Sequence, residues 1–298
     1  MENTVEATSL PLHIKYKRKS QAANIWKRMK RNRIAMVGLV IFVMIVLVII
    51  FANLIAPYGN ALKQDMDIRL QGPSAAHWFG TDAYGRDIFA RIVHGSRNSV
   101  ISGIVAVFVG ITIGGIFAAI AGYYGGKLDT AIMRVMDTLM SIPLMLLSLA
   151  IVAALGPGLV NALIALMLAM IPYYTRVIRS AMLTIVGQDF IEAARSCGTP
   201  DRYIIIKHIL PNAVGTVIVQ ATMSVGIMII NAAGLSFLGM GVQPPTPEWG
   251  SMLPEGKDYM MYAPFLVLFP GLAITITALS LNLMGDGLRD ALDPRLKD

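Results

Sequence analysis

An uncharged apolar run near the start of the chain limits what the protein can fold into. Ile34 to Ala56 is 23 residues long, carries no charged side chain and is rich in Val, Ile, Leu and Met. As an α-helix it would measure about 35 Å, which is enough to cross a bilayer core and longer than the apolar core of a typical signal peptide. We therefore interpret this run as a retained membrane span.

Five further segments resemble membrane spans, because each is about 20 residues long, mostly apolar and bounded by Gly, Pro or charged residues. They lie near residues 98–121, 130–154, 159–180, 213–238 and 263–284. The composition agrees, since 55% of the residues are hydrophobic and only 14% are charged, whereas roughly a quarter are charged in soluble domains. The sequence predicts an all-α membrane protein with six transmembrane helices.

The distribution of basic residues predicts an orientation. An even number of spans places both termini on one side, and with the N-terminus inside, 19 of the 25 Lys and Arg lie in inner segments. The positive-inside rule then predicts cytoplasmic termini, and the basic residues before the first span favour a membrane surface over nucleic acid. The predicted parts are a basic cytoplasmic tail, the first span, an extracytoplasmic loop, a transmembrane core and a cytoplasmic C-terminal tail, at 1–33, 34–56, 57–97, 98–284 and 285–298.

Several kinds of site are not expected. The single cysteine, Cys197, has no partner for an internal disulfide, and the four histidines lack the close spacing of a metal site. A phosphate-binding loop is also missing, because Gly125-Gly126-Lys127 lacks the leading glycine and is followed by Leu128. We expect no metal, no cofactor and no nucleotide chemistry from this chain itself.

Four charged residues lie within predicted spans, near their inner ends. Arg134 and Asp137 are three residues apart and can pair on one helix face, and Arg176 and Arg179 follow one span later. Long side chains at that depth reach the interface, so we interpret these residues as anchors and interhelical contacts rather than an ion pathway.

Glycines and prolines predict details of the packing. Gly110 and Gly114 form a GxxxG pair that lets helices approach closely. Pro143 and Pro172 fall inside the third and fourth spans, where each removes a backbone donor and is expected to kink the helix.

Two outer loops carry polar or rigid sequences. Asp82, Arg86 and Asp87 lie close together near glycines, and we favour ion-paired turns over acid–base chemistry. The proline-rich loop at 241–262 is expected either to shape the outer mouth or to contact a protein that delivers substrate.

The segment between the fourth and fifth spans is different in character, because it alternates polar and apolar residues. The pattern predicts a helix over Asp189–Cys197, a stop at Gly198, an N-cap at Thr199 before Pro200, and a second helix over Asp201–Leu210 that ends at Pro211.

The first of these helices is predicted to be amphipathic. Its apolar stripe consists of Phe190, Ala193, Ala194 and Cys197, and its polar residues, Glu192 among them, are available to solvent or to a partner. Two interpretations stay open, because periodicity does not separate a helix lying on lipid from one that docks into a groove of another protein.

The same residues resemble a known signature. Glu192, Ala193 and Ala194, then Gly198 and, after twelve more residues, Pro211 are similar to the EAA signature of membrane permeases from bacterial ATP-binding cassette importers. This chain has His208 where the usual pattern has isoleucine, a departure that is common in the dipeptide and oligopeptide branch.

Three other stretches extend the resemblance. HWFGTDAYGRDIFARIVHGSRNSV (77–100), FLGMGVQPPTPEWGSML (237–253) and the C-terminal residues 269–298 are similar to the dipeptide, oligopeptide, nickel and glutathione permease group. With the six predicted spans, the resemblance covers nearly everything after residue 25, and it points to the second (C-type) of two permeases that pair.

The resemblance implies the type I importer permease fold, with residues 187–211 as a cytoplasmic loop whose coupling helix fits a cleft on an ATPase. It implies that Glu192, Ala193, Ala194, Gly198 and Pro211 couple transport to the ATPase. The implied partners are a second homologous permease, two cytoplasmic ATPase subunits and an extracytoplasmic solute-binding protein, in a bacterial or archaeal cell membrane and without nucleic acid.

The implied function is non-catalytic: the chain would form, with the second permease, a path for dipeptides or oligopeptides, and nickel or other metal chelates and glutathione stay open as substrates. By position in the fifth span, Thr222, Ser224 and Asn231 are candidate pathway residues, with interhelical hydrogen bonding as the alternative. A self-sufficient secondary transporter is less expected, because no charge lies near the middle of a predicted span. A membrane scaffold that only recruits soluble proteins is less expected still.

Overall fold

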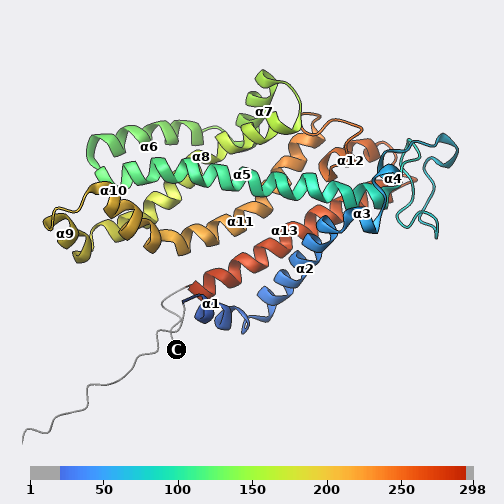
Figure 1. Cartoon of the computed structure of the whole chain (residues 1–298). Coiled ribbons are helices and arrows are strands. Elements are labelled where there is room, and N and C mark those ends of the chain that lie inside the picture. The colour runs from blue at the N-terminus through green and yellow to red at the C-terminus, as the bar shows by residue number, and fades with distance from the viewer. Residues whose placement is uncertain (1–20, 293–298) are drawn as a thin grey trace, which may run out of the picture.

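The structure is a computed structural model that describes residues 21–292, with side chains from residue 25. The ends of both predicted tails, 1–20 and 293–298, lie outside the described residues. The described chain is helical throughout its regular parts (Figure 1), as α1 (Gln21–Met29), α2 (Arg33–Ile50), α3 (Ala52–Ile55), α4 (Tyr58–Leu62), η1 (Met66–Ile68), α5 (Ile88–Tyr124), α6 (Gly126–Met140), α7 (Leu144–Leu155), α8 (Leu159–Val186), α9 (Asp189–Ser196), α10 (Asp201–Tyr203), the π-helical turn η2 (Ile204–Ile209), α11 (Leu210–Phe237), α12 (Trp249–Lys257) and α13 (Phe265–Leu292).

Within the described residues, five helices are long and apolar enough to cross a membrane, namely α2, α5, α8, α11 with the turn before it, and α13. The third predicted span, 130–154, is not one kinked helix. It is a pair, α6 and α7, bent by 87° at a short break. Pro143 explains the break, because it has no N–H to continue α6 and it disfavours a helical residue before it. The helix α8, in contrast, continues through Pro172.

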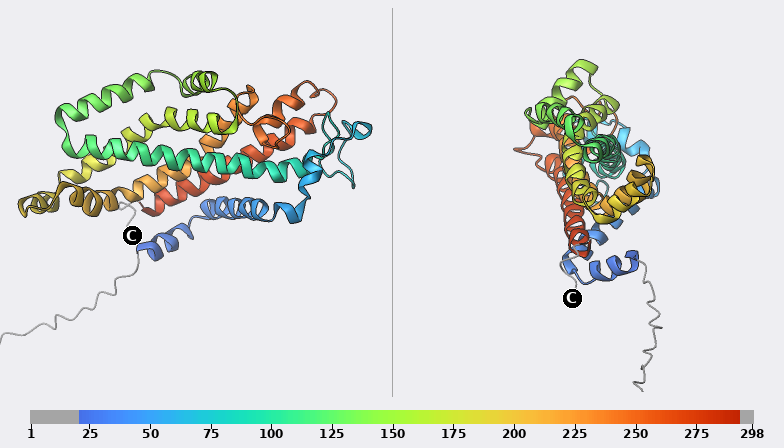
Figure 2. Two further views of the ribbon diagram at one scale, coloured as in Figure 1. Left: turned by 45° about the horizontal axis from the view of Figure 1, so that its top comes forward. Right: turned by 90° about the vertical axis from the view of Figure 1, so that its left-hand side faces the viewer.

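The long helices lie side by side, and α5, α8 and α13 run toward the α9 and α10 side while α2 and α11 run the other way (Figures 1 and 2). α5 packs along α8 and α11, and α13 packs between α11 and α2. α9 and α10 stand at one end of the molecule, called here the α9 end, and α12 lies near α3 and α4 at the other, the α12 end. The described ends of the chain, α1 and the last turn of α13, are directed toward the α9 end. This agrees with an even number of spans if the bent pair α6 and α7 is counted as the sixth.

Two glycines allow α5 to lie very close to α8. A Cβ added at Gly110 would come within 2.9 Å of the Tyr174 ring, and one at Gly114 within 2.9 Å of the Tyr174 Cβ and 3.1 Å of the Ile171 carbonyl oxygen. The predicted close approach through the GxxxG pair is therefore confirmed, and its partner is the buried Tyr174 of α8.

α5 begins ten residues earlier than its predicted start near residue 98. Asp87 caps it by accepting from the Ala90 N–H at 2.8 Å, so the outer loop predicted at 57–97 ends at this cap. The sequence obscured this start because Arg91 and Arg97 lower the local hydropathy. Arg91 is nevertheless only 1% exposed, which requires partners inside the fold.

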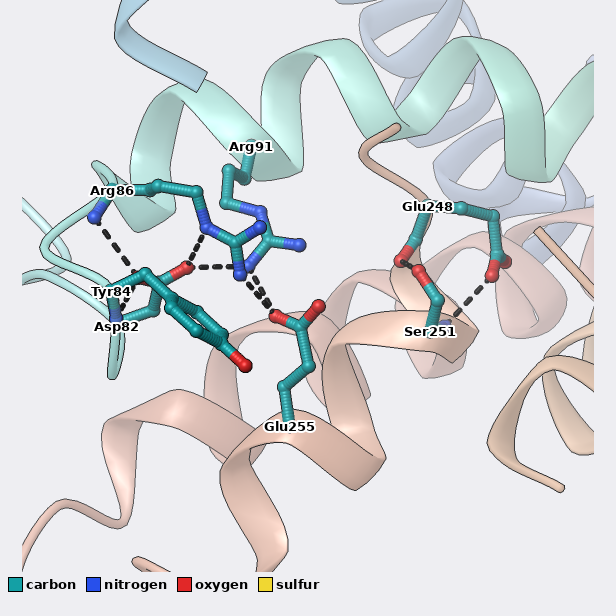
Figure 3. A network of polar contacts seen from close by, with 7 residues as sticks. All are labelled: Asp82, Tyr84, Arg86, Arg91, Glu248, Ser251 and Glu255. Atoms are coloured by element: carbon teal, nitrogen blue, oxygen red, sulfur yellow. Dashed lines mark hydrogen bonds and ion pairs between the residues drawn. The ribbon is translucent and has the colours of Figure 1, made fainter. Parts of the chain in front are cut away.

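Those partners come from two distant segments (Figure 3). One carboxylate oxygen of Asp82 accepts from Arg86 Nε at 2.6 Å and from Arg91 Nη1 at 2.5 Å, and one oxygen of Glu255 on α12 accepts from Arg86 Nη2 at 2.6 Å and from Arg91 Nη1 at 2.5 Å. The predicted ion-paired turn is confirmed for Asp82 and Arg86. The cluster of these four residues, here the outer ion cluster, also joins the two outer loops, which the sequence did not reveal.

The charged residues near the α9 end connect helices. Arg179 of α8 binds the Asp129 carboxylate through Nε and Nη2, both at 2.5 Å, and Arg176 of α8 pairs with Asp137 of α6. The predicted interhelical role is confirmed. The suggested pairing of Arg134 with Asp137 is wrong, because α6 lies alongside α8 and turns Asp137 toward Arg176.

We predict that Gly114→Ala destabilises the protein by about 1–3 kcal/mol, because the added methyl group overlaps the α8 backbone. The adjacent Gly115→Ala is the matched control, since its methyl group would only reach Ile178 at 3.7 Å. Thermal unfolding midpoints of the purified variants in one detergent would test this, and equal midpoints would contradict it.

We predict that Glu255→Gln costs about 3–5 kcal/mol, because removing one partner leaves two buried arginines facing a single carboxylate. Lys257→Gln, at an exposed position on the same helix, should leave the unfolding midpoint unchanged. A Glu255→Gln midpoint equal to that of Lys257→Gln would show that the outer ion cluster does not hold the loops together.

Candidate functional site

α9 and α10 form a knob that extends past the ends of α8 and α11 (Figures 1 and 2). Gly198 ends α9 with φ of +74°, while the Gly198 N–H donates to the Arg195 carbonyl at 2.9 Å and the Thr199 N–H to the Ala194 carbonyl at 3.1 Å. This left-handed stop confirms the predicted role of Gly198 in the turn, since glycine adopts it without steric cost.

The second half of the knob differs from the prediction. Pro200, rather than Thr199, occupies the N-cap position of α10, without a side-chain capping bond. The helix does not end at Pro211, because it continues through the π-helical turn η2 into α11, where Pro211 lies in the first turn. Proline removes one backbone donor, and a π-type turn just before it is a common way to keep such a helix continuous.

The inward side of α9 is also not the predicted stripe. Ile191 is fully buried and belongs to the same apolar cluster as Ile204, Tyr174 and Met182. Of the predicted stripe only Ala194 is partly buried, whereas Phe190 (41% exposed), Ala193 and Cys197 are exposed. Ile191 and Ala194 are three residues apart, so the sequence allowed two stripes, and the one containing isoleucine is the one that packs inward.

Tyr123 at the end of α5 fastens the knob to the helix bundle. Its hydroxyl donates to the Asp201 carboxylate at 2.7 Å, and the Arg195 guanidinium lies 4.8 Å from the centre of its ring. One side chain thereby holds both helices of the knob. Sequence reasoning missed Tyr123, because nothing local in α5 indicates a partner 78 residues later.

Among residues 21–292, which the structure describes, no hydrogen bond or ion pair attaches the outward side of α9. Glu192 and Ala193 are exposed on it, next to Phe190 and Asp189. The fifth predicted coupling residue, Pro211, is exposed as well, at the base of α11. The arrangement is a short, anchored helix that presents two acidic side chains, one aromatic side chain and one small side chain.

The predicted pathway residues on α11 do not gather in one place. Ser224 is fully buried, with Gln220 Nε2 at 3.4 Å from its hydroxyl. Thr222 and Asn231 are partly exposed, and each donates to the backbone carbonyl four residues earlier, at 2.9 Å. Nine residues separate these two positions, so they point to opposite sides of the helix.

Comparisons with known proteins identify the family. Residues 110–298 match the binding-protein-dependent transport system inner membrane component family, and residues 20–73 match the N-terminal transmembrane domain of oligopeptide transport permease C. The chain is also similar in fold to the permease in inward-facing structures of the MetNI methionine ABC transporter, with a TM-score of 0.57 and 21% identity over 69% of this chain and 98% of that one.

Curated relatives are similar over almost their whole length. The glutathione transport system permease protein GsiD of Escherichia coli O6:K15:H31 is 47% identical over 91% of this chain and 90% of the relative. The dipeptide transport system permease protein DppC of Alkalihalophilus pseudofirmus is 45% identical over 99% of this chain and 96% of the relative. The chain therefore belongs to the binding-protein-dependent inner membrane components, the multi-pass permease subunits of ATP-binding cassette importers, which work with separate ATPase subunits.

Proposed function

We propose that this permease subunit imports small peptides, that α9 is its coupling helix, and that Glu192, Ala193, Ala194, Gly198 and Pro211 form the contact with the ATPase or shape it. The observation that carries the proposal is the combination of a firmly anchored inner side of α9, through Ile191, with an unattached outer side. A helix held in this way transmits movement from a partner to the helices behind it.

Docking explains α9 better than contact with lipid does. A helix lying on a membrane surface presents a basic polar side and buries its apolar side in lipid. The outward side of α9 carries Asp189 and Glu192 beside Phe190, and acidic groups are repelled by an anionic leaflet. A short helix with small and aromatic side chains fits a groove on another protein.

The distribution of charge supports a cytoplasmic α9 end, with both termini on that side of a bacterial or archaeal cell membrane. The α12 end would then face outward. There Met260, Met261 and Tyr262 are exposed, Met261 by 94%, and we assign this surface to the extracytoplasmic solute-binding protein. A second, homologous permease completes the path, and since Thr222 and Asn231 point to opposite sides of α11, at most one of them lies on its wall.

The substrate class follows from two relatives of similar identity, one described as a glutathione and the other as a dipeptide permease protein. Both compounds are small peptides with a free carboxylate and a free ammonium group. Dipeptides and short oligopeptides are therefore the proposed cargo, with glutathione as the alternative. ATP-dependent uptake of a labelled dipeptide into vesicles containing the complete transporter, with glutathione as competitor, tests the choice, and uptake of neither would contradict the proposal.

We predict that Glu192→Ala lowers ATP-dependent uptake about tenfold or more at matched abundance, the effect of losing one charge-assisted contact with the ATPase. The same variant should weaken stimulation of the ATPase by substrate. Ile191→Ala is the contrasting variant, since loss of a buried side chain should reduce abundance itself. Unchanged uptake by Glu192→Ala would remove this residue from the coupling contact.

We predict that Gly198→Ala lowers uptake by altering the turn, while Gly187→Ala does not. An added Cβ meets nothing within 4 Å at either position. The backbone differs, because φ is +74° at Gly198 and −88° at Gly187, and a side chain in the left-handed region costs about 1–2 kcal/mol. Uptake and membrane abundance are measured for both variants. Equal uptake by the Gly198→Ala and Gly187→Ala transporters would contradict a role for the backbone of Gly198.

A further inference from the structure

A polar groove lies between α8 and α11, at the base of the knob. Its volume is about 510 Å³, within the range of cavities that hold small ligands. Its exposed polar side chains, which define the polar groove here, are Arg176, Ser180 and Thr184 of α8 and Asn212 and Thr216 of α11. Val177, Ala181, Ile185 and Ala213 complete its lining.

A hydrogen bond joins α8 to α11 on the side of the groove away from the knob. Gln220 follows Asn212 and Thr216 at four-residue intervals, so all three lie along one side of α11. Its amide donates to the Tyr173 hydroxyl of α8 at 2.8 Å and joins the two helices. Polar groups thus extend along α11 from the base of the knob up to this bridge.

Such a surface is unsuited to contact with lipid tails. Arg176 and its partner Asp137 keep 47% and 50% of their side chains exposed, and three hydroxyl-bearing residues and an amide lie beside them in the groove or next to it. Each polar group left facing hydrocarbon is unfavourable, and charged groups within spans line water-filled cavities or the interior of a bundle. The polar groove therefore faces water.

We propose that the polar groove is a binding subsite for the carboxylate end of a peptide on the inner part of the transport path, an inference that rests on the proposed function. Arg176 supplies the cation, while Ser180, Thr216 and Asn212 offer hydrogen bonds to the peptide backbone. The half-exposed Asp137 next to Arg176 matches the ammonium group of the same ligand. A zwitterion is complementary to this pair of opposite charges, and an uncharged solute is not.

Cysteine labelling in the complete transporter tests the subsite. In a Cys197→Ser parent, single Ser180→Cys and Thr216→Cys variants are treated in lipid nanodiscs with an anionic, membrane-impermeant thiol reagent. Ile218→Cys is the control, because Ile218 is exposed on the other side of α11 and outside the groove. Both groove positions should react, and dialanine at twice its dissociation constant should slow them about threefold, whereas dialanine amide, which lacks the carboxylate, should not.

The remaining outcomes are equally decisive. Protection that survives Arg176→Gln, or that the amide also gives, would overturn the assignment of Arg176. Reaction without protection would show a water-filled wall that binds no peptide, and absence of reaction would show that protein covers the groove; both overturn the subsite. Uptake of dialanine by the wild-type transporter is measured separately, so failure of the proposed function appears there and not in the labelling.

Discussion

The close contact of α5 with α8 sets the rest of the structure. Gly110 and Gly114 leave room for the Tyr174 ring, and without that room the two long helices would have to separate. α8 leads directly into α9, and the last turn of α5, which ends at Tyr124, carries Tyr123, the residue that holds the knob. The position of α9 is therefore fixed by packing that occurs far along both helices.

The two ends of the molecule are stabilised by different kinds of interaction. At the α12 end, buried charges join the outer loops, and each arginine needs both carboxylates to compensate for its burial. At the α9 end, apolar burial of Ile191 and the contacts of Tyr123 attach a helix whose other side stays open. The first arrangement stabilises a fixed junction, and the second leaves a surface for a separate subunit.

Much of the fold was predictable because a lipid bilayer admits only long, apolar helices of this kind. Long apolar runs gave α2, α8, α11 and α13, and the GxxxG pair and Gly198 had the local roles that their chemistry indicates. Hydropathy cannot distinguish a kink from an 87° break, because α6 and α7 keep the composition of one span. The start of α5 contains Arg91, whose burial depends on the distant Glu255. The inner side of α9 contains Ile191 rather than Phe190, and only the tertiary fold decides between these two residues.

The candidate site was predictable only in part, for a similar reason. The residues of the knob are contiguous in sequence and were found there, whereas Tyr123 and the polar groove arise where separate helices meet. Thr222, Ser224 and Asn231 were chosen by depth along one span, which carries no information about the direction in which a side chain points.

The outer ion cluster also has a consequence for how the chain is made. Arg91 and its partner Glu255 are 164 residues apart. At synthesis rates of roughly 5–20 residues per second, the arginine leaves the ribosome about 8–33 s before the carboxylate. During that interval Asp82 is the only acidic member of the cluster that already exists. The junction at the α12 end therefore forms only after α12 has been made, and a chain truncated before α12 can never complete it.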